Sequence, residues 1–153
     1  MECQGGFLIS QIKQISGRVL SKILAERNIT EFNGAQGRIL YILWQGDSIS
    51  IKEIATKTGL AKTSLTGMLD HMEKIGLIQR IYAKEDRRKT LIKLTEKAQS
   101  LKLEFDEVSR AMSTLIYKGF SKAEILSFEE NLKRILANLA ASTMNFIINS
   151  FNK

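Results

Sequence analysis

Apolar residues recur along this chain at two spacings, which predict two kinds of element. Intervals of three and four residues predict amphipathic helices over about 7–27, 34–45, 51–58, 62–75, 96–118 and 122–149. Between residues 77 and 95, the runs LIQRIY and LIKLT alternate apolar and polar positions, which predicts a β-hairpin. The fold class is therefore expected to be mostly α with one small β-hairpin.

Residues that begin and end helices stand at these boundaries. Asn33, Ser50 and Ser121 each precede a helical pattern and have Gln or Glu three residues later, as in a capping box. Thr95 is expected to cap the helix that follows the hairpin. Glycines follow four of the helical patterns and are expected at C′ positions with positive φ: Gly46, Gly59, Gly76 and Gly119.

The segment 50–95 contains two short helices joined by the turn TGLAK, and then the hairpin. Two short helices around a glycine-containing turn predict a helix-turn-helix motif, whose second helix enters the major groove of DNA. The apolar face of the helix 62–75 is expected to be core: Leu65, Met68, Leu69, Met72 and Ile75.

The opposite face of this helix is small, hydroxylated and lightly basic at its N-terminal half. Lys62, Thr63, Ser64 and Thr66 lie there and are suited to base edges and phosphates. Gly67 on the same face either permits a close approach to DNA or is a tolerated surface glycine. The helix is thus a candidate recognition helix.

Charge is concentrated in the same part of the chain. The net charge is +7, and residues 50–98 hold eleven Lys or Arg against six Asp or Glu, whereas 1–49 and 99–153 carry only +1 each. A localised basic surface favours nucleic acid as the partner. The hairpin tip, KEDRRKT, is either a solvated turn or a basic loop that reaches an adjacent minor groove, where arginine is favoured.

The terminal helices are long and apolar. With no proline in the chain, the last one would extend about 42 Å, which matches the diameter of a whole domain. Its apolar residues, which include Met144, Phe146, Ile147 and Phe151, and those of the helix 7–27 exceed what one compact core covers. A homodimer formed by these helices is expected; the alternative is a monomeric bundle that buries them internally.

Several classes of protein are disfavoured. The chain has no apolar run long enough to span a membrane and no secretory signal, and its single cysteine, Cys3, cannot form an internal disulfide, so a cytoplasmic protein is expected. It also lacks nucleophile–base arrangements, phosphate-binding loops and clustered histidines. We therefore expect no enzyme activity, cofactor or metal.

The stretches GAQGRILYILW (34–44), ISIKEIATKTGLAKTSLTGMLDHMEKIGLIQR (49–80) and EDRRKTLIKLTEKA (85–98) together resemble the multiple antibiotic resistance regulator (MarR) family of winged-helix regulators. The resemblance covers nearly the whole chain, and residues 1–153 are expected to form a single domain of this family. It implies a DNA-binding lobe over about 34–95 and dimerisation helices over about 7–29 and 96–150. It also implies a homodimer on a pseudo-palindromic operator, and a repressor relieved by a small aromatic or phenolic effector.

The resemblance also assigns roles within the hairpin, the wing of the motif. It implies that Arg88 of the D-x-R pattern lies in the minor groove and that Asp86 holds its guanidinium. It places Lys84, Arg87 and Lys89 at phosphates. These assignments give the tip a role beyond that of a charged turn.

The sequence departs from the family pattern at two positions. Ala61 stands where relatives often have a capping serine, and Gly67 stands where they often have a basic residue, which removes a side-chain contact with DNA. Two other interpretations remain: a winged-helix module for protein contacts, and a thiol-based sensor that uses Cys3.

Overall fold

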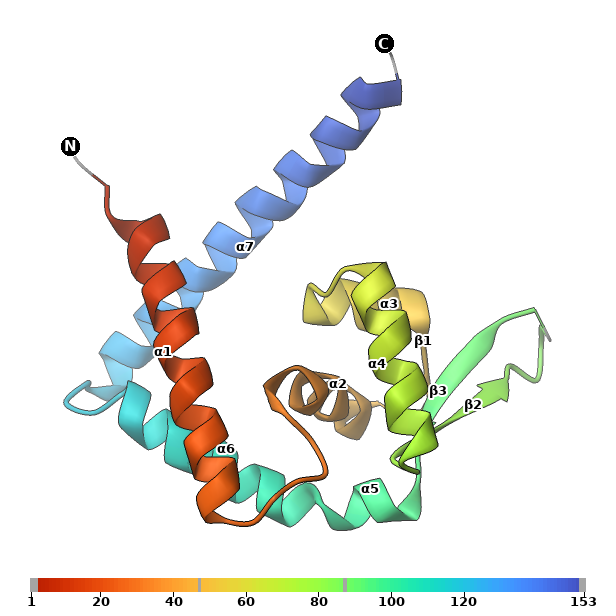
Figure 1. Cartoon of the computed structure of the whole chain (residues 1–153). Helices are drawn as coiled ribbons and strands as arrows, with labels where there is room; N and C mark the ends of the chain where they lie inside the picture. Colours follow the sequence, from red (N-terminus) through yellow and green to blue (C-terminus); the bar gives the residue numbers. More distant parts are fainter. Residues whose placement is uncertain (1–2, 47, 87, 152–153) are drawn as a thin grey trace. The chain divides into compact units, whose positions relative to one another are not determined.

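The chain is mostly helical, with one small sheet (Figure 1). The computed structural model describes residues 3–46, 48–86 and 88–151, and side chains as far as residue 142. In order, its elements are α1 (Gly5–Glu26), α2 (Gly34–Gln45), β1 (Ile49–Ser50), α3 (Ile51–Thr58), α4 (Lys62–Lys74), β2 (Ile78–Tyr82), β3 (Thr90–Leu94), α5 (Glu96–Ser100), α6 (Lys102–Ile116) and α7 (Lys122–Phe151). The predicted fold class is confirmed.

These elements form two compact units, Met1–Met112 and Ser113–Lys153. The first contains α1 to α5, the sheet and most of α6. The second contains the end of α6 and α7, where the Tyr117 hydroxyl donates to Glu129 at 2.8 Å and the Tyr117 ring contacts Phe120 and Phe128. The boundaries expected for a DNA-binding lobe and dimerisation helices remain a prediction.

The core of the first unit lies among α2, α3, α4 and the sheet. Ile39 and Leu40 of α2 and Ile54 of α3 are fully buried. The expected apolar face of α4 is confirmed, with Leu65, Leu69 and Met72 buried and Met68 and Ile75 packed against the core. Burying one side of α4 leaves its other side available at the surface.

The sheet is antiparallel, with strand order β1-β3-β2. Ile78 pairs with Leu94, and both side chains are buried, whereas the pair at the far end of the hairpin, Tyr82 and Thr90, lies beyond the core. Strand β1, in which Ile49 pairs with Ile92, was not predicted because a two-residue strand carries no alternation. The hairpin therefore projects from a three-stranded base.

The helix boundaries follow the predicted capping residues. The Asn33 side chain accepts from the amides of Ala35 and Gln36, and the Ser121–Glu124 pair forms a reciprocal capping box. Ser50 and Thr95 cap α3 and α5 through the amides of Glu53 and Ala98. Positive φ is confirmed at three glycines: Gly59, Gly76 and Gly119.

Two local predictions are wrong. Gly46 has φ −145° and ψ 143°, because the chain leaves α2 in an extended conformation toward β1 and makes no left-handed turn. The helix expected over 96–118 is interrupted at Leu101, which separates α5 from α6. Beside the break, the Ser100 hydroxyl donates to the carbonyl of Lys97 at 2.7 Å, a local bond that competes with the helical pattern.

Candidate nucleic-acid interface

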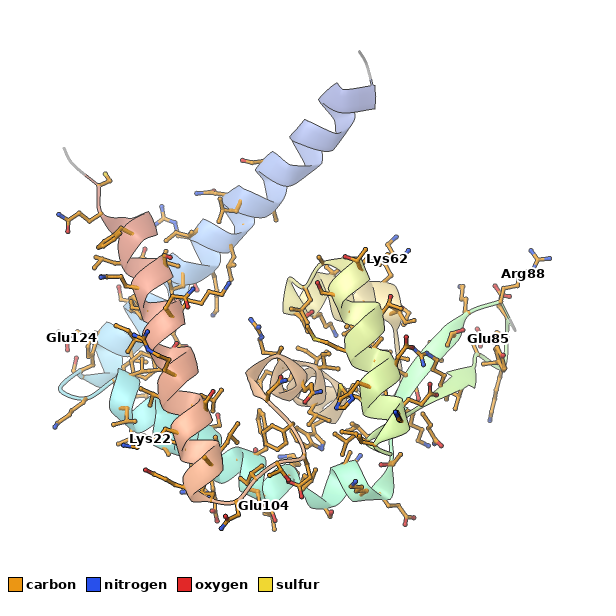
Figure 2. All side chains as sticks on the ribbon, viewed as in Figure 1. Lys22, Lys62, Glu85, Arg88, Glu104 and Glu124 are labelled. Carbon is orange, nitrogen blue, oxygen red and sulfur yellow. The ribbon has the colours of Figure 1, made fainter. Side chains whose placement is uncertain are left out.

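The exposed face of α4 carries the residues predicted to contact DNA. The side chains of Lys62, Thr63, Ser64 and Thr66 are exposed, and Lys62 lies at the N-terminal end of the helix (Figure 2). The Thr66 hydroxyl donates to the carbonyl of Lys62 at 3.0 Å and keeps acceptor capacity. No atom lies within 4 Å of where a Cβ of Gly67 would stand, so packing within the protein does not require glycine there.

The N-terminus of α4 lacks a side-chain cap, as predicted from Ala61. Its C-terminal end is held by residues that follow the hairpin. The Thr95 hydroxyl donates to the Gly76 carbonyl at 2.6 Å, and Lys97 Nζ donates to the Ile75 carbonyl at 2.8 Å. These bonds join the end of the candidate recognition helix to the start of α5.

An ion-pair network links α4 to the wing, and no pattern in the sequence predicted it. Arg80 of β2 donates to Asp70 Oδ1 at 2.6 Å through Nη2, and its Nη1 pairs with Glu73. Burial acts to lower the pKa of Arg80, but the hydrogen bonds to Asp70 and then Glu73 outweigh it, so the pKa lies above its ordinary value. Arg80 therefore offsets two carboxylates of α4 and fixes the helix against the strand.

Backbone hydrogen bonds close the tip of the wing. The Ala83 amide donates to the Lys89 carbonyl and the Lys89 amide donates to the Asp86 carbonyl, each at 2.9 Å. Asp86 Oδ1 accepts a hydrogen bond from the backbone amide of Arg88 at 3.0 Å. The resemblance implied a contact between Asp86 and the guanidinium of Arg88. Short acidic side chains readily bind an amide two residues on in a turn, which explains the difference.

The basic side chains of the wing point to solvent. Lys84, Arg88 and Lys89 are exposed, and Arg88 extends outward from the tip (Figure 2). Arg87 lies outside the described residues. In the same view Lys62 lies at the upper end of α4 and Arg88 lies at the outer end of the hairpin.

A second feature of the first unit is a pocket of about 360 Å³. The Phe105 ring lines it and contacts three other rings, those of Phe32, Tyr41 and Trp44, at centroid distances of 5.8, 6.2 and 4.8 Å. Among the lining residues Arg38 alone is charged; the full set is Leu20, Phe32, Asn33, Gly34, Gly37, Arg38, Tyr41, Phe105, Val108, Ser109 and Met112. Sequence reasoning missed this pocket, because its residues come from α1, α2, α6 and the segment before α2.

The described residues also bear on metal binding and on membrane insertion. Within the described part of the chain, no three His, Cys, Asp or Glu side chains gather into a group that could hold a metal ion. No described helix is both long and apolar enough to cross a membrane.

A helix-turn-helix with a basic hairpin beside its second helix defines the class of winged-helix DNA-binding proteins.

Comparison with known proteins identifies the family. The MarR family model matches residues 32–90. The transcriptional regulator FarR of Neisseria gonorrhoeae is 30% identical over 118 residues, 77% of this chain and 76% of FarR. The chain belongs to the MarR family and is a DNA-binding transcriptional regulator, not an enzyme. A regulator from Bacillus subtilis, YfiV, is 35% identical over 66 residues, a match that spans only 41% of YfiV.

Solved structures show the same fold. A cysteine-to-serine mutant of Escherichia coli MarR, complexed with operator DNA, aligns with TM-score 0.75 at 24% identity over 86% of this chain and 92% of that one. BpsR of Bordetella bronchiseptica, whose DNA binding is regulated by 6-hydroxynicotinic acid, aligns with TM-score 0.76 at 18% identity over 85% of this chain and 91% of BpsR.

Proposed function

We propose that this protein is a homodimeric repressor that binds a pseudo-palindromic operator and is released by a small aromatic acid. The observation that carries the proposal is the exposed, hydroxylated and basic face of α4 beside an exposed basic wing. Repression of a promoter requires only that this surface occupy the site. Because such a regulator acts on chromosomal DNA, we also infer that it works in the cytoplasm.

Each protomer would place α4 in a major groove and its wing in the adjacent minor groove. Lys62, Thr63, Ser64 and Thr66 would contact base edges and phosphates, and Gly67 would let the duplex approach the helix closely. In the wing, Arg88 would enter the minor groove while Asp86 holds its backbone. Phosphate contacts would come from the remaining basic residues: Lys84, Arg87 and Lys89.

Exposed apolar side chains support the homodimer. On α1, Phe7 is 65% exposed and Ile12 is 53% exposed, and on α7, Leu136 is 67% exposed. A monomeric bundle would bury these side chains, whereas here they remain at the surface of both units. The farther apolar residues expected on α7, Met144, Phe146, Ile147 and Phe151, lie outside the described side chains. A second copy of the chain is the covering that the exposed residues favour.

The pocket supports a small-molecule effector. Its aromatic lining suits a planar ring, and the exposed guanidinium of Arg38 suits a carboxylate or phenolate on that ring. The pocket is lined by α6, which follows α5, and α5 holds the end of α4 through Lys97. A ligand that shifts α6 would thereby reorient α4, a coupling of about 1–3 kcal/mol.

A titration of duplex DNA at two salt concentrations tests the DNA surface. We expect the logarithm of affinity to fall linearly with the logarithm of salt concentration, by about 0.9 per phosphate contacted. No binding, or binding without this slope, would favour a protein-contact module. Unchanged release of DNA by peroxide after Cys3→Ser would exclude the thiol-sensor interpretation.

The effector is tested by titrating benzoate while following the fluorescence of Trp44, the only tryptophan, whose ring contacts Phe105. We expect a saturable signal and weaker DNA binding. Arg38→Gln should lose the fluorescence signal and the effect of benzoate on DNA binding, while its affinity for DNA without benzoate stays unchanged. Arg18→Gln is a matched change on α1 outside the pocket lining, and it should keep the signal, the benzoate effect and the DNA affinity. Equal responses in both variants would exclude Arg38 as the anchor.

A further inference from the structure

Tyr82 is an exposed aromatic residue that the roles above leave unassigned. It is the last residue of β2, pairs with Thr90 across the hairpin, and is 72% exposed. The other large apolar side chains found exposed in the described structure belong to α1, α2, α6, α7 and the turn before α7. Tyr82 is therefore separate from the apolar surface that supports a dimer.

The side of β2 on which Tyr82 lies is turned toward α4. Because side chains alternate along a strand, Ile78, Arg80 and Tyr82 share one face. Ile78 is buried in the core beside α4, and Arg80 reaches Asp70 and Glu73 of α4. Tyr82 continues this row by about 7 Å toward the tip. It consequently stands between the candidate recognition helix and the wing tip.

The geometry of a duplex determines what this position would face. If α4 occupies a major groove and Arg88 the adjacent minor groove, the sugar-phosphate backbone that separates the two grooves must pass between them. We propose that Tyr82 binds this backbone and that its hydroxyl donates a hydrogen bond to a phosphate oxygen. The inference rests on the docking proposed above.

The residues around Tyr82 favour a phosphate as the acceptor of its hydrogen bond. Lys84 and Lys89 are exposed on the same hairpin, so the surroundings attract an anion. Arg80 is already engaged by two carboxylates, which leaves Tyr82 as the outermost donor of the row. A hydrogen bond from a neutral phenol to a charged phosphate is among the stronger ones and carries no base preference.

The test compares Tyr82→Phe and Tyr82→Ala with the unmodified full-length protein on a duplex selected from random DNA, at two salt concentrations. Tyr82→Phe should weaken binding about tenfold, since it removes only the hydroxyl. The salt slope should stay unchanged, since a neutral phenol releases no counterion. Gln79→Ala, an exposed polar position on the other face of β2, should bind within about twofold of the unmodified protein.

Several results would overturn the proposal. Binding of Tyr82→Phe within twofold of the unmodified protein excludes the hydrogen bond, even if Tyr82→Ala is weaker. A reduced salt slope in Tyr82→Phe would mean that the substitution disturbs ionic contacts of the wing. An unmodified protein that binds no duplex would instead refute the regulator function itself, so the two failures are distinguishable. Unchanged circular dichroism confirms that each variant is folded.

Discussion

Arg88 and its neighbour Arg87 have the same side chain but different expected roles. The backbone of Arg88 is held by Asp86 at 3.0 Å, and its guanidinium extends from the wing tip. A fixed backbone reduces the entropy lost when an arginine enters a narrow minor groove, where negative potential favours it. Both the fixed backbone of Arg88 and its outward position therefore favour its insertion into the minor groove.

We predict that Arg88→Ala weakens operator binding by about 1–3 kcal/mol and more than Arg87→Ala does. The reason is that a minor-groove arginine senses the width of the groove, whereas a phosphate contact is one of several. Fluorescence anisotropy with labelled duplexes gives both values. Loss of preference for A·T-rich flanking sequence should accompany Arg88→Ala alone. The reverse order of the two variants would mean that the register of the hairpin differs by one residue.

At the scale of single residues, the sequence indicates which residues have a role better than it indicates which groups their side chains bind. The resemblance of EDRRKT to the D-x-R pattern of the family assigned roles to Arg88 and Asp86, which stay predictions, and it did not show that Asp86 binds a backbone amide. In the sequence, Arg80 occupies a polar position of an alternating strand, and nothing there indicates its ion pairs. Its partners Asp70 and Glu73 lie on another element, and only the packing of β2 against α4 brings the three together.

At the scale of elements, the N-terminus of α4 has no side-chain cap. Ala61 has extended dihedral angles, φ −62° and ψ 139°, as an N-cap residue requires, but has no acceptor atom. We predict that Ala61→Ser accepts from the amide of Thr63 or Ser64 and raises the free energy of unfolding by about 1 kcal/mol. Urea denaturation at fixed protein concentration measures this value. Ala61→Val, which lacks an acceptor, should give no gain, and equal stabilisation by both would exclude capping.

The Arg80 network is predicted to support DNA binding, by neutralising Asp70 and Glu73, more than it stabilises the fold. Arg80→Gln leaves Asp70 and Glu73 uncompensated near the proposed DNA surface, so affinity should fall about tenfold through repulsion of phosphates. The free energy of unfolding should change by no more than about 1 kcal/mol, because the ion pairs are partly exposed.

A matched variant separates repulsion from lost geometry. Adding Asp70→Asn and Glu73→Gln to Arg80→Gln should restore most of the affinity, because no unpaired carboxylate then faces the phosphates. Anisotropy titrations at constant salt give the comparison. Affinity that stays low in the triple variant would show that Arg80 acts by holding the angle between α4 and β2.

Element boundaries were predictable wherever one residue determines them. Asn33, Thr95 and Gly59 mark helix ends through their own side chain or backbone freedom, and each does so in the structure. Gly46 was misassigned because the path after α2 depends on the pairing of Ile49 with Ile92, far along the chain. The break between α5 and α6 at Leu101 was not predicted, because neither Gly nor Pro stands near it in the sequence.

At the scale of the whole molecule, length and apolar content predicted more helical surface than one core can bury. The exposed side chains of α1 and α7 agree with that expectation. The pocket was not predictable in the same way, since its wall combines Leu20, Gly37 and Phe105 from three helices. Such a site exists only after the helices pack.

We predict that Ile12→Glu separates the protomers, because it places a charge within the exposed apolar stripe of α1. Sedimentation velocity should show a dimer for the unmodified protein and a monomer for this variant. Operator affinity should fall about a hundredfold or more when the two half-sites are no longer bound together. Gln14→Glu, an exposed position on the other side of α1, should remain dimeric.

The operator itself gives an independent test of the same symmetry. A two-fold dimer sets its recognition helices about 34 Å apart, one turn of the duplex, so both α4 helices meet major grooves on one face. Inserting about five base pairs between the half-sites turns one of them to the opposite face. Binding by the unmodified protein should fall to the level of Ile12→Glu, while Ile12→Glu binds both duplexes equally. Equal affinity of the unmodified protein for both duplexes would show that each protomer binds DNA on its own.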